Sequence, residues 1–267
     1  MSERAKKLII DTWRTGLHGE RIGFRQREQW MSKSRAFTRD MKIIGRIKED
    51  DSDIGFLGIR ENAWKGKSKD GKEDKLRGRL ILRNFSKDGH WLGSIEEMVA
   101  WELGSSIAVN SEIPYFAVIM SNYDYIVPVR KVHQRVTMRE SFTFELMNPK
   151  TFLVDVFELK SERISIGSDW HLYYRNVKED QEVALLDSRR FDVGGKVEIT
   201  IHSEEFAGNQ VLKNVLALFS GSVKYHGEIK DRLKNRVNEL RSGKRTVRPT
   251  KGELWLMRNP RRFGTKL

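Results

Sequence analysis

Apolar and polar residues alternate along much of the chain, which is typical of strands that bury one face. Several of these segments are also rich in aromatic and β-branched residues, which favour strands. The pattern predicts strands at 79–85, 114–120, 125–132, 142–146, 152–159, 170–174 and 197–201. After a turn at Gly252, a short strand is expected at 254–257. These strands predict a sheet that is mostly antiparallel.

Apolar residues at helical spacing interrupt this pattern. A short amphipathic helix is expected at 5–15, with the alternatives of an arm that docks on a membrane or partner and a helix packed on its own domain. Ser94 with Glu97 resembles a capping box that opens a second helix, and Asn209 is a candidate N-cap for a third. A very basic helix is expected at 227–241. The predicted fold class is α+β, a mostly antiparallel β-sheet with two helical insertions and a basic C-terminal helix.

A charged, glycine-punctuated stretch indicates how the chain is organised. Residues 61–78 are expected to form a charged flexible loop between a basic N-terminal region, 1–60, and an α+β core domain, 79–260. Residues 261–267 are expected to form a basic tail.

Composition narrows the protein class. The chain has 267 residues, with 13 Phe, 7 Trp and 6 Tyr, which are too many aromatic residues for a chain that never buries them. The absence of cysteine excludes a disulfide scaffold, a thiolate zinc site and a cysteine nucleophile. No apolar run approaches the roughly 20 residues of a membrane-spanning helix, and the first residues lack the core of a signal peptide. A cytoplasmic or nuclear location is expected.

The net charge of +13 is concentrated in the two ends of the sequence. Residues 1–48 carry 13 basic and 5 acidic side chains, and residues 228–267 carry 13 basic and 4 acidic ones. The middle, 49–227, is slightly acidic. Two cationic ends around a near-neutral body favour a polyanionic partner, either RNA, a ribonucleoprotein or an anionic membrane surface, although basic tails also serve solubility alone.

The basic residues at the ends are the candidate binding residues for nucleic acid or lipid. On a helix, Arg232 and Arg236 are neighbours one turn apart, and Leu233 and Val237 supply the packed face. The segment is therefore expected to form a solvated cationic ridge, and a nuclear import signal is an alternative role. The candidates are Arg4, Lys6, Lys7, Arg232, Lys234, Arg236, Arg241, Lys244, Arg245, Arg248, Arg261 and Arg262.

Catalytic motifs are scarce. No Walker loop, nucleophile elbow or histidine-based zinc motif occurs, so no catalytic residue, metal or cofactor is expected. One weak constellation remains, in which Asp124, Asp155, Glu158 and Lys160 hold Mg²⁺ as in restriction-type nucleases. Because Glu158 and Lys160 alternate along a strand, they also fit an ordinary solvent-facing row.

Aromatic residues beside cations are a second weak signal. Trp64 with Lys65 and Lys67, Trp91 with His90, and Tyr173-Tyr174-Arg175 have the composition of platforms that stack single-stranded bases. Core aromatic residues at strand ends give the same pattern.

The order of elements resembles that of rhabdovirus matrix proteins over about 79–260. The strand Arg79–Arg83, a helix containing Trp101 and the strand opened by Pro114-Tyr115-Phe116 are similar to the first half of the matrix core. The second half is represented by Ser188-Arg-Arg-Phe191, the alternating strand 197–201, Ser203-Glu-Glu205, two helices and Leu254-Trp-Leu256. The chain lacks the P-P-x-Y and P-T/S-A-P budding motifs of many animal members, and its region 130–185 is longer.

The resemblance implies a function. The expected protein is a non-enzymatic, self-associating viral matrix-like protein, peripheral to an anionic membrane, whose basic ends bridge that membrane and a ribonucleoprotein. It would be found in the virion and the host cytoplasm, with the host nucleus possible. The element order is also similar to that of viral movement proteins and of influenza-type interferon antagonists. An RNA-binding movement or host-antagonist protein and a Mg²⁺-dependent nuclease are therefore the alternatives.

Overall fold

The structure is a computed structural model that describes residues 6–12, 24–50, 52–67, 71–133, 139–148, 151–162, 169–176, 181–188, 195–244, 246 and 249–258. Among these residues, no helix is long and apolar enough to cross a membrane.

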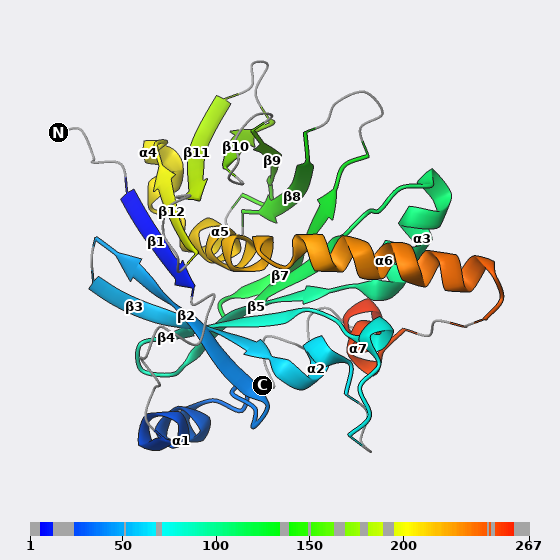
Figure 1. Cartoon of the computed structure of the whole chain (residues 1–267). Coiled ribbons are helices and arrows are strands. Elements are labelled where there is room, and N and C mark those ends of the chain that lie inside the picture. The colour runs from blue at the N-terminus through cyan, green and yellow to red at the C-terminus, as the bar shows by residue number, and fades with distance from the viewer. Residues whose placement is uncertain are drawn as a thin grey trace.

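Twelve antiparallel strands close into a barrel (Figure 1). Each strand pairs with the next along the chain, and β1 pairs with both β2 and β12, which closes the circle. The predicted fold class, a sheet with two helical insertions, is therefore wrong. The strands are β1 (Lys6–Thr12), β2 (Met41–Glu49), β3 (Ser52–Arg60), β4 (Ile81–Ser86), β5 (Trp91–Glu97), β6 (Tyr115–Met120), β7 (Tyr123–Lys131), β8 (Ser141–Met147), β9 (Val154–Ser161), β10 (Trp170–Tyr174), β11 (Gln181–Ser188) and β12 (Lys196–Ile201).

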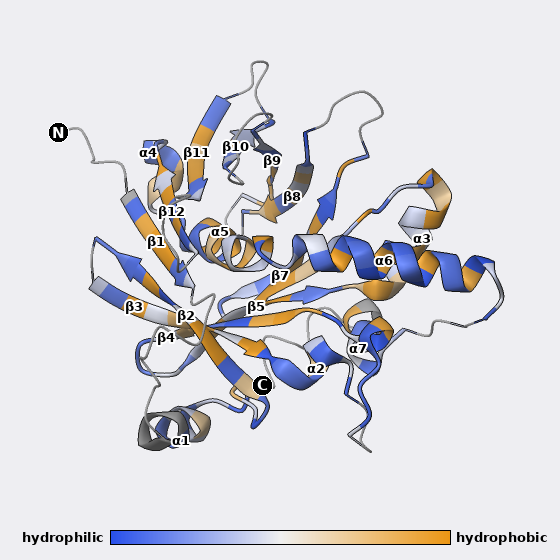
Figure 2. Ribbon diagram, viewed as in Figure 1, coloured by the Kyte–Doolittle hydropathy of each residue, from blue (hydrophilic) through white to orange (hydrophobic). Residues whose placement is uncertain are grey.

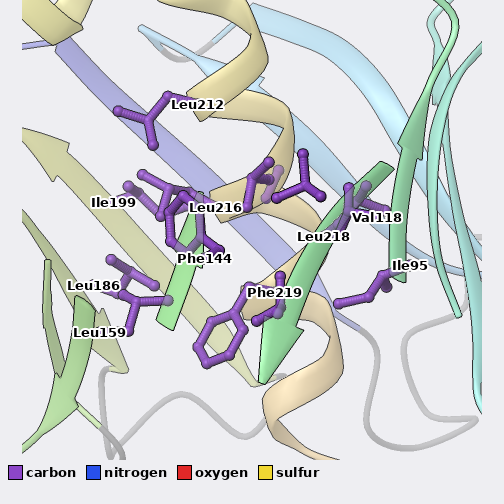
Figure 3. Packing of buried hydrophobic residues seen from close by; sticks show 14 of the residues in the cluster. Ile95, Val118, Phe144, Leu159, Leu186, Ile199, Leu212, Leu216, Leu218 and Phe219 are labelled. Carbon is purple, nitrogen blue, oxygen red and sulfur yellow. The ribbon is translucent and has the colours of Figure 1, made fainter. Parts of the chain in front are cut away.

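The barrel is filled by a helix, α5 (Gln210–Val223) (Figure 3). Its apolar residues share one buried cluster with inward-facing residues of strands all around the barrel, among them Leu57, Phe116, Phe144, Leu159, Leu186 and Ile199. A helix that is apolar on nearly every side is stable only when it is enclosed. The predicted N-cap is confirmed, because the side chain of Asn209 accepts a hydrogen bond from the backbone N–H of Leu212 at 3.0 Å.

The two ends of the barrel carry different helices and turns. Because neighbouring strands are antiparallel, their connections alternate between the ends. One end carries α2 (Glu61–Lys65), the 3₁₀ turn η1 (Lys75–Arg77) and α3 (Val99–Val109), with α6 (His226–Arg241) and α7 (Lys251–Arg258) packed on them. We call this the helical end. The opposite end, the hairpin end, has the turns β2–β3, β4–β5, β6–β7 and β8–β9 and the short helix α4 (Glu204–Ala207).

The outer wall of the barrel carries the last helix, α1 (Phe24–Lys33). Its Trp30 packs with a ring-centroid distance of 4.5 Å on Phe56, which points away from the interior beside the inward-facing Leu57. The barrel thus uses strands from 6–60 as well as from 79–201, and residues 61–78 contribute α2 and η1.

Three predicted elements have the wrong type over part or all of their length. The helix expected to open at Ser94 is strand β5 up to Glu97, and helix α3 begins only at Val99. The expected helix at 5–15 is strand β1, whose Leu8 and Ile10 face the barrel interior. The expected strand at 254–257 is part of helix α7. Its capping signal lies just upstream, where Glu253 N–H donates to Thr250 Oγ1 at 3.2 Å and Thr250 N–H donates to Glu253 Oε2 at 2.8 Å. This reciprocal pair is a capping box.

Candidate functional site

Two arginines of the predicted cationic ridge are buried inside the protein. Arg232 and Arg236 lie on the face of α6 that packs against the barrel, and Arg236 is only 1% exposed. The predicted solvated ridge is therefore wrong for these two residues. The face of α6 that remains exposed begins with Glu228 and Asp231, so it is mixed in charge (Figure 2 shows α6 as mostly hydrophilic).

The partner of both arginines is Glu97, a fully buried carboxylate at the end of β5. Its Oε1 accepts a hydrogen bond from Arg236 Nη1 at 2.8 Å, and its Oε2 lies 3.4 Å from Arg232 Nη2. Arg236 also donates to the backbone carbonyls of Leu76 and Gly78. These contacts hold α6 against η1 and β5, so the two arginines stabilise the packing of the helix on the barrel.

Glu102 of α3 completes this buried ionic cluster of Glu97, Glu102, Arg232 and Arg236. Its Oε2 lies 3.7 Å from Arg236 Nη1, and its Oε1 accepts the N–H of Tyr115 at 3.1 Å. Burial, reinforced by the charge of Glu97, raises the pKa of Glu102 well above its ordinary value. The carboxyl of Glu102 therefore keeps its proton to a higher pH than an exposed glutamate does.

Arg232 also accounts for one of the predicted aromatic platforms. Its guanidinium lies 3.8 Å from the ring centroid of Trp64, and its Nη1 donates to the Trp64 carbonyl at 3.1 Å. Trp64 also packs edge to face with Tyr225, with ring centroids 4.8 Å apart. Trp64 thus stacks on an internal cation, which leaves less of its ring for a base.

The other predicted cations fall into three groups. Lys234, Arg241 and Lys244 are exposed on the second half of α6 and just beyond it, where Arg241 donates to Asn110 Oδ1 at 2.9 Å. Lys7 is paired with Glu198 at 2.7 Å on the barrel wall. The side chain of Lys6, and all of Arg4, Arg245, Arg248, Arg261 and Arg262, lie outside the described residues.

The sequence interpretation missed an exposed aromatic surface at the helical end. Trp101 of α3 is 47% exposed and stacks on Tyr115 with a centroid distance of 5.4 Å. Tyr115 in turn packs against the buried cluster that contains Leu256 of α7, the helix that also carries Trp255, which is 55% exposed. A hydrogen bond from Ala100 N–H to Glu253 Oε1 at 2.8 Å joins the two helices.

We call Trp101, Tyr115, Leu254 and Trp255 the aromatic face. Exposed cations lie on the elements of the same end of the barrel. Arg130 pairs with Tyr115 across the sheet, and Lys251 begins α7. Arg241 and Lys244 lie where α6 ends, beside the C-terminal end of α3. No charge pattern or motif marks the aromatic face in the sequence. That Trp101 is exposed can be recognised only once it is known which side of α3 packs against the barrel.

The acidic constellation expected for Mg²⁺ does not come together. Glu158 points outward, between the inward-facing Phe157 and Leu159, whereas Asp155 accepts a hydrogen bond from Tyr174 Oη at 3.0 Å near the interior cluster. Among the described residues, no group of three or more acidic or histidine side chains is placed to hold a metal ion.

Glu158 is occupied by protein partners. It accepts hydrogen bonds from Ser141 and Arg175, and Lys160 lies 3.9 Å away. Burial opposes ionisation, but these donors outweigh it and hold the pKa of Glu158 below its usual range. The nuclease alternative remains an untested prediction, although its acidic residues do not converge in the structure.

The last two aromatic candidates lie on the barrel wall. Trp91 is half-buried, and its indole N–H donates to Ser94 Oγ at 2.9 Å. Tyr173 carries the ammonium of Lys160 4.8 Å from its ring centroid. Comparisons of the chain with protein-family models, with curated proteins and with solved structures find no match, so the resemblance to rhabdovirus matrix proteins stays a prediction.

Proposed function

We propose that this protein is a non-enzymatic binding protein of the matrix type, and that its helical end binds single-stranded RNA, free or within a ribonucleoprotein. The observation that carries the proposal is the aromatic face, which exposes Trp101 and Trp255 at the end of the barrel that also carries the exposed cations of α6 and α7.

Single strands are held by this combination of groups. Bases stack on aromatic rings whatever their sequence, and lysine and arginine neutralise the phosphates. Tyr115 behind Trp101 fixes the plane of the indole, so less conformational freedom is lost when a base stacks on it. The buried ionic cluster supports the surface from below, because it fixes α6 against the ends of β5 and α3.

The test is binding of fluorescein-labelled oligouridine to the full-length protein, followed by fluorescence anisotropy. Trp255→Ala is expected to weaken binding about 5- to 150-fold, the range for losing one stacked base. Arg241→Glu with Lys244→Glu is expected to weaken binding and to flatten the plot of log K against log salt by about 0.7 for each phosphate that the variant no longer neutralises.

Lys87→Glu is the matched control, because Lys87 is exposed on the β4–β5 turn at the hairpin end. This variant should bind RNA like the wild type. The proposal is wrong if Lys87→Glu weakens binding as much as the α6 variants do, or if Trp255→Ala has no effect. Flotation with anionic vesicles that depends on Arg241 and Lys244, without RNA binding, would assign these cations to the membrane instead.

A further inference from the structure

The hairpin between β8 and β9 presents three consecutive apolar side chains to solvent. Phe152 is 69% exposed, Leu153 is 67% exposed and Val154 is 38% exposed. They follow the last residues of β8 and stand at the hairpin end, opposite the aromatic face. Val154 begins β9, but two adjacent exposed apolar residues on the turn itself are unusual, because turns are normally polar.

The described residues of this tip, 148 and 151–153, make hydrogen bonds to one another. Asn148 N–H donates to the Leu153 carbonyl at 2.9 Å, and Phe152 N–H donates to the Asn148 carbonyl at 2.8 Å. Thr151 N–H and Leu153 N–H donate to the side chains of Asn148 and Thr151, at 3.4 and 3.3 Å. The N–H groups of residues 151–153 are therefore all satisfied within the turn.

Phe152 adopts a backbone conformation that bulky residues rarely occupy, with φ at +56°. Such a conformation costs free energy and persists only where the surroundings impose it. Here the bonds of the turn impose it, and the result is that both Phe152 and Leu153 point outward rather than folding back onto the barrel.

These features fit a lipid bilayer better than a protein pocket. A segment can enter a bilayer only if its backbone polar groups are bonded internally, which this turn achieves for three successive N–H groups. The tip is also small, since a stable protein interface takes about 800 Å² from each partner and a large aromatic side chain contributes about 150–250 Å².

The charges nearby give no reason to expect an anionic lipid. Exposed carboxylates lie at other turns of the hairpin end, at Asp50, Asp88 and Asp124, but Lys87 is exposed beside Asp88 and Lys150 precedes the tip in the sequence. A surface of mixed charge gains little from a negative membrane, so binding is expected to come mainly from the apolar side chains and to depend only weakly on salt.

We propose that the β8–β9 tip inserts Phe152 and Leu153 into the interfacial region of a lipid bilayer, irrespective of headgroup charge. This inference is independent of RNA binding at the helical end. The two are separable because their residues lie on opposite ends of the barrel.

The experiment is flotation of the full-length protein with neutral phosphatidylcholine vesicles in high salt. The wild type should float, and the double variant Phe152→Asn, Leu153→Asn should lose flotation, with a partition coefficient at least about tenfold lower. Asparagine is chosen because it tolerates a positive φ, so the turn is expected to keep its shape. Phe152→Trp should retain flotation.

Trp255→Ala serves as the matched control, since it removes an exposed aromatic residue from the other end and should float like the wild type. The inference is overturned if the wild type does not float on neutral vesicles, or if the double variant floats as well as the wild type. It is also overturned if the double variant instead abolishes self-association in sedimentation velocity without changing flotation, which would make a second copy the occupant of the tip.

Discussion

Replacing His226 with phenylalanine is expected to remove a loss of stability that the wild type suffers between pH 7 and pH 5. His226 begins α6 at the point where the chain leaves the barrel, and its ring stacks on Phe116 at 5.6 Å between centroids. Ser222 Oγ donates to the Phe219 carbonyl at 2.7 Å, so the imidazole Nε2–H donates to Ser222 Oγ at 3.1 Å. In the described part of the chain, Nδ1 has no hydrogen-bond partner.

The size of the effect follows from the pKa of this imidazole. Burial lowers the pKa of His226 from 6.5 to about 4, and the charges of Lys230 and Lys131 act in the same direction against that of Glu140. The unfolded chain binds a proton near pH 6.5, but the folded protein does so only near pH 4. The contribution of His226 to the free energy of unfolding is therefore fully present above about pH 6.5 and is lost as the pH drops toward 4. The loss amounts to about 3 kcal/mol in all and about 2 kcal/mol by pH 5.

The assay is urea unfolding of the wild type and His226→Phe at pH 7, 6 and 5. The free energy of unfolding of the wild type, minus that of the variant, should fall by about 2 kcal/mol over this range. Glu102 acts in the opposite sense, since its raised pKa makes the folded protein the better proton binder as the pH falls. Glu102→Gln should therefore steepen the decline. A difference between wild type and His226→Phe that does not change with pH would refute the reasoning.

Two further predictions concern stability at neutral pH and are checked by urea unfolding. Glu97→Gln should lower the free energy of unfolding by about 3–5 kcal/mol, because it removes the nearest counter-charge of the buried Arg236, the one to which it is hydrogen-bonded. The exposed pair of Glu61 and Lys65 provides the control, and Glu61→Gln should cost less than about 1 kcal/mol. Asn209→Ala should cost about 1 kcal/mol through removal of the cap of α5, and Asn209→Ser should restore most of it; equal stability of the two variants would contradict this.

Elements whose signals are local could be predicted from the sequence. The strand at 170–174 is found at the expected residues, and α5 and α6 begin within one or two residues of the predicted positions. In α5, the N-cap residue and the helically spaced apolar residues are close together in the sequence. Tertiary contacts are not needed to recognise such a segment.

Closure of the barrel could not be predicted, because it depends on one pairing between distant residues. Leu8 of β1 lies opposite Ile199 of β12, and neither strand has a sequence feature that identifies the other as its pairing partner. The short segment 5–15 has apolar residues in a run, and such a run fits a helix face as well as a strand that is covered on both sides. Pairing on both sides decides in favour of the strand.

The candidate site could not be predicted for a related reason. Arg232 and Arg236 have the same spacing whether they face a ligand or the barrel, and their partner Glu97 is more than 130 residues away. The spacing of Glu97 from Ser94 imitates a capping box, although both residues belong to strand β5. The capping box that does form, between Thr250 and Glu253, starts α7 and so places the exposed Trp255 on a helix instead of the predicted strand.

The two proposed binding surfaces are far enough apart to be used at the same time. Strands of six to nine residues, such as β4 and β3, rise about 3.3 Å per residue, so the two ends of the barrel are separated by roughly 20–30 Å. A bilayer that holds Phe152 and Leu153 therefore leaves the aromatic face pointing away from it. RNA bound there should not compete with neutral vesicles, and this would make one compact barrel a bridge between the two. Displacement of the protein from neutral vesicles by RNA would show that both ligands use one surface, which this geometry does not allow.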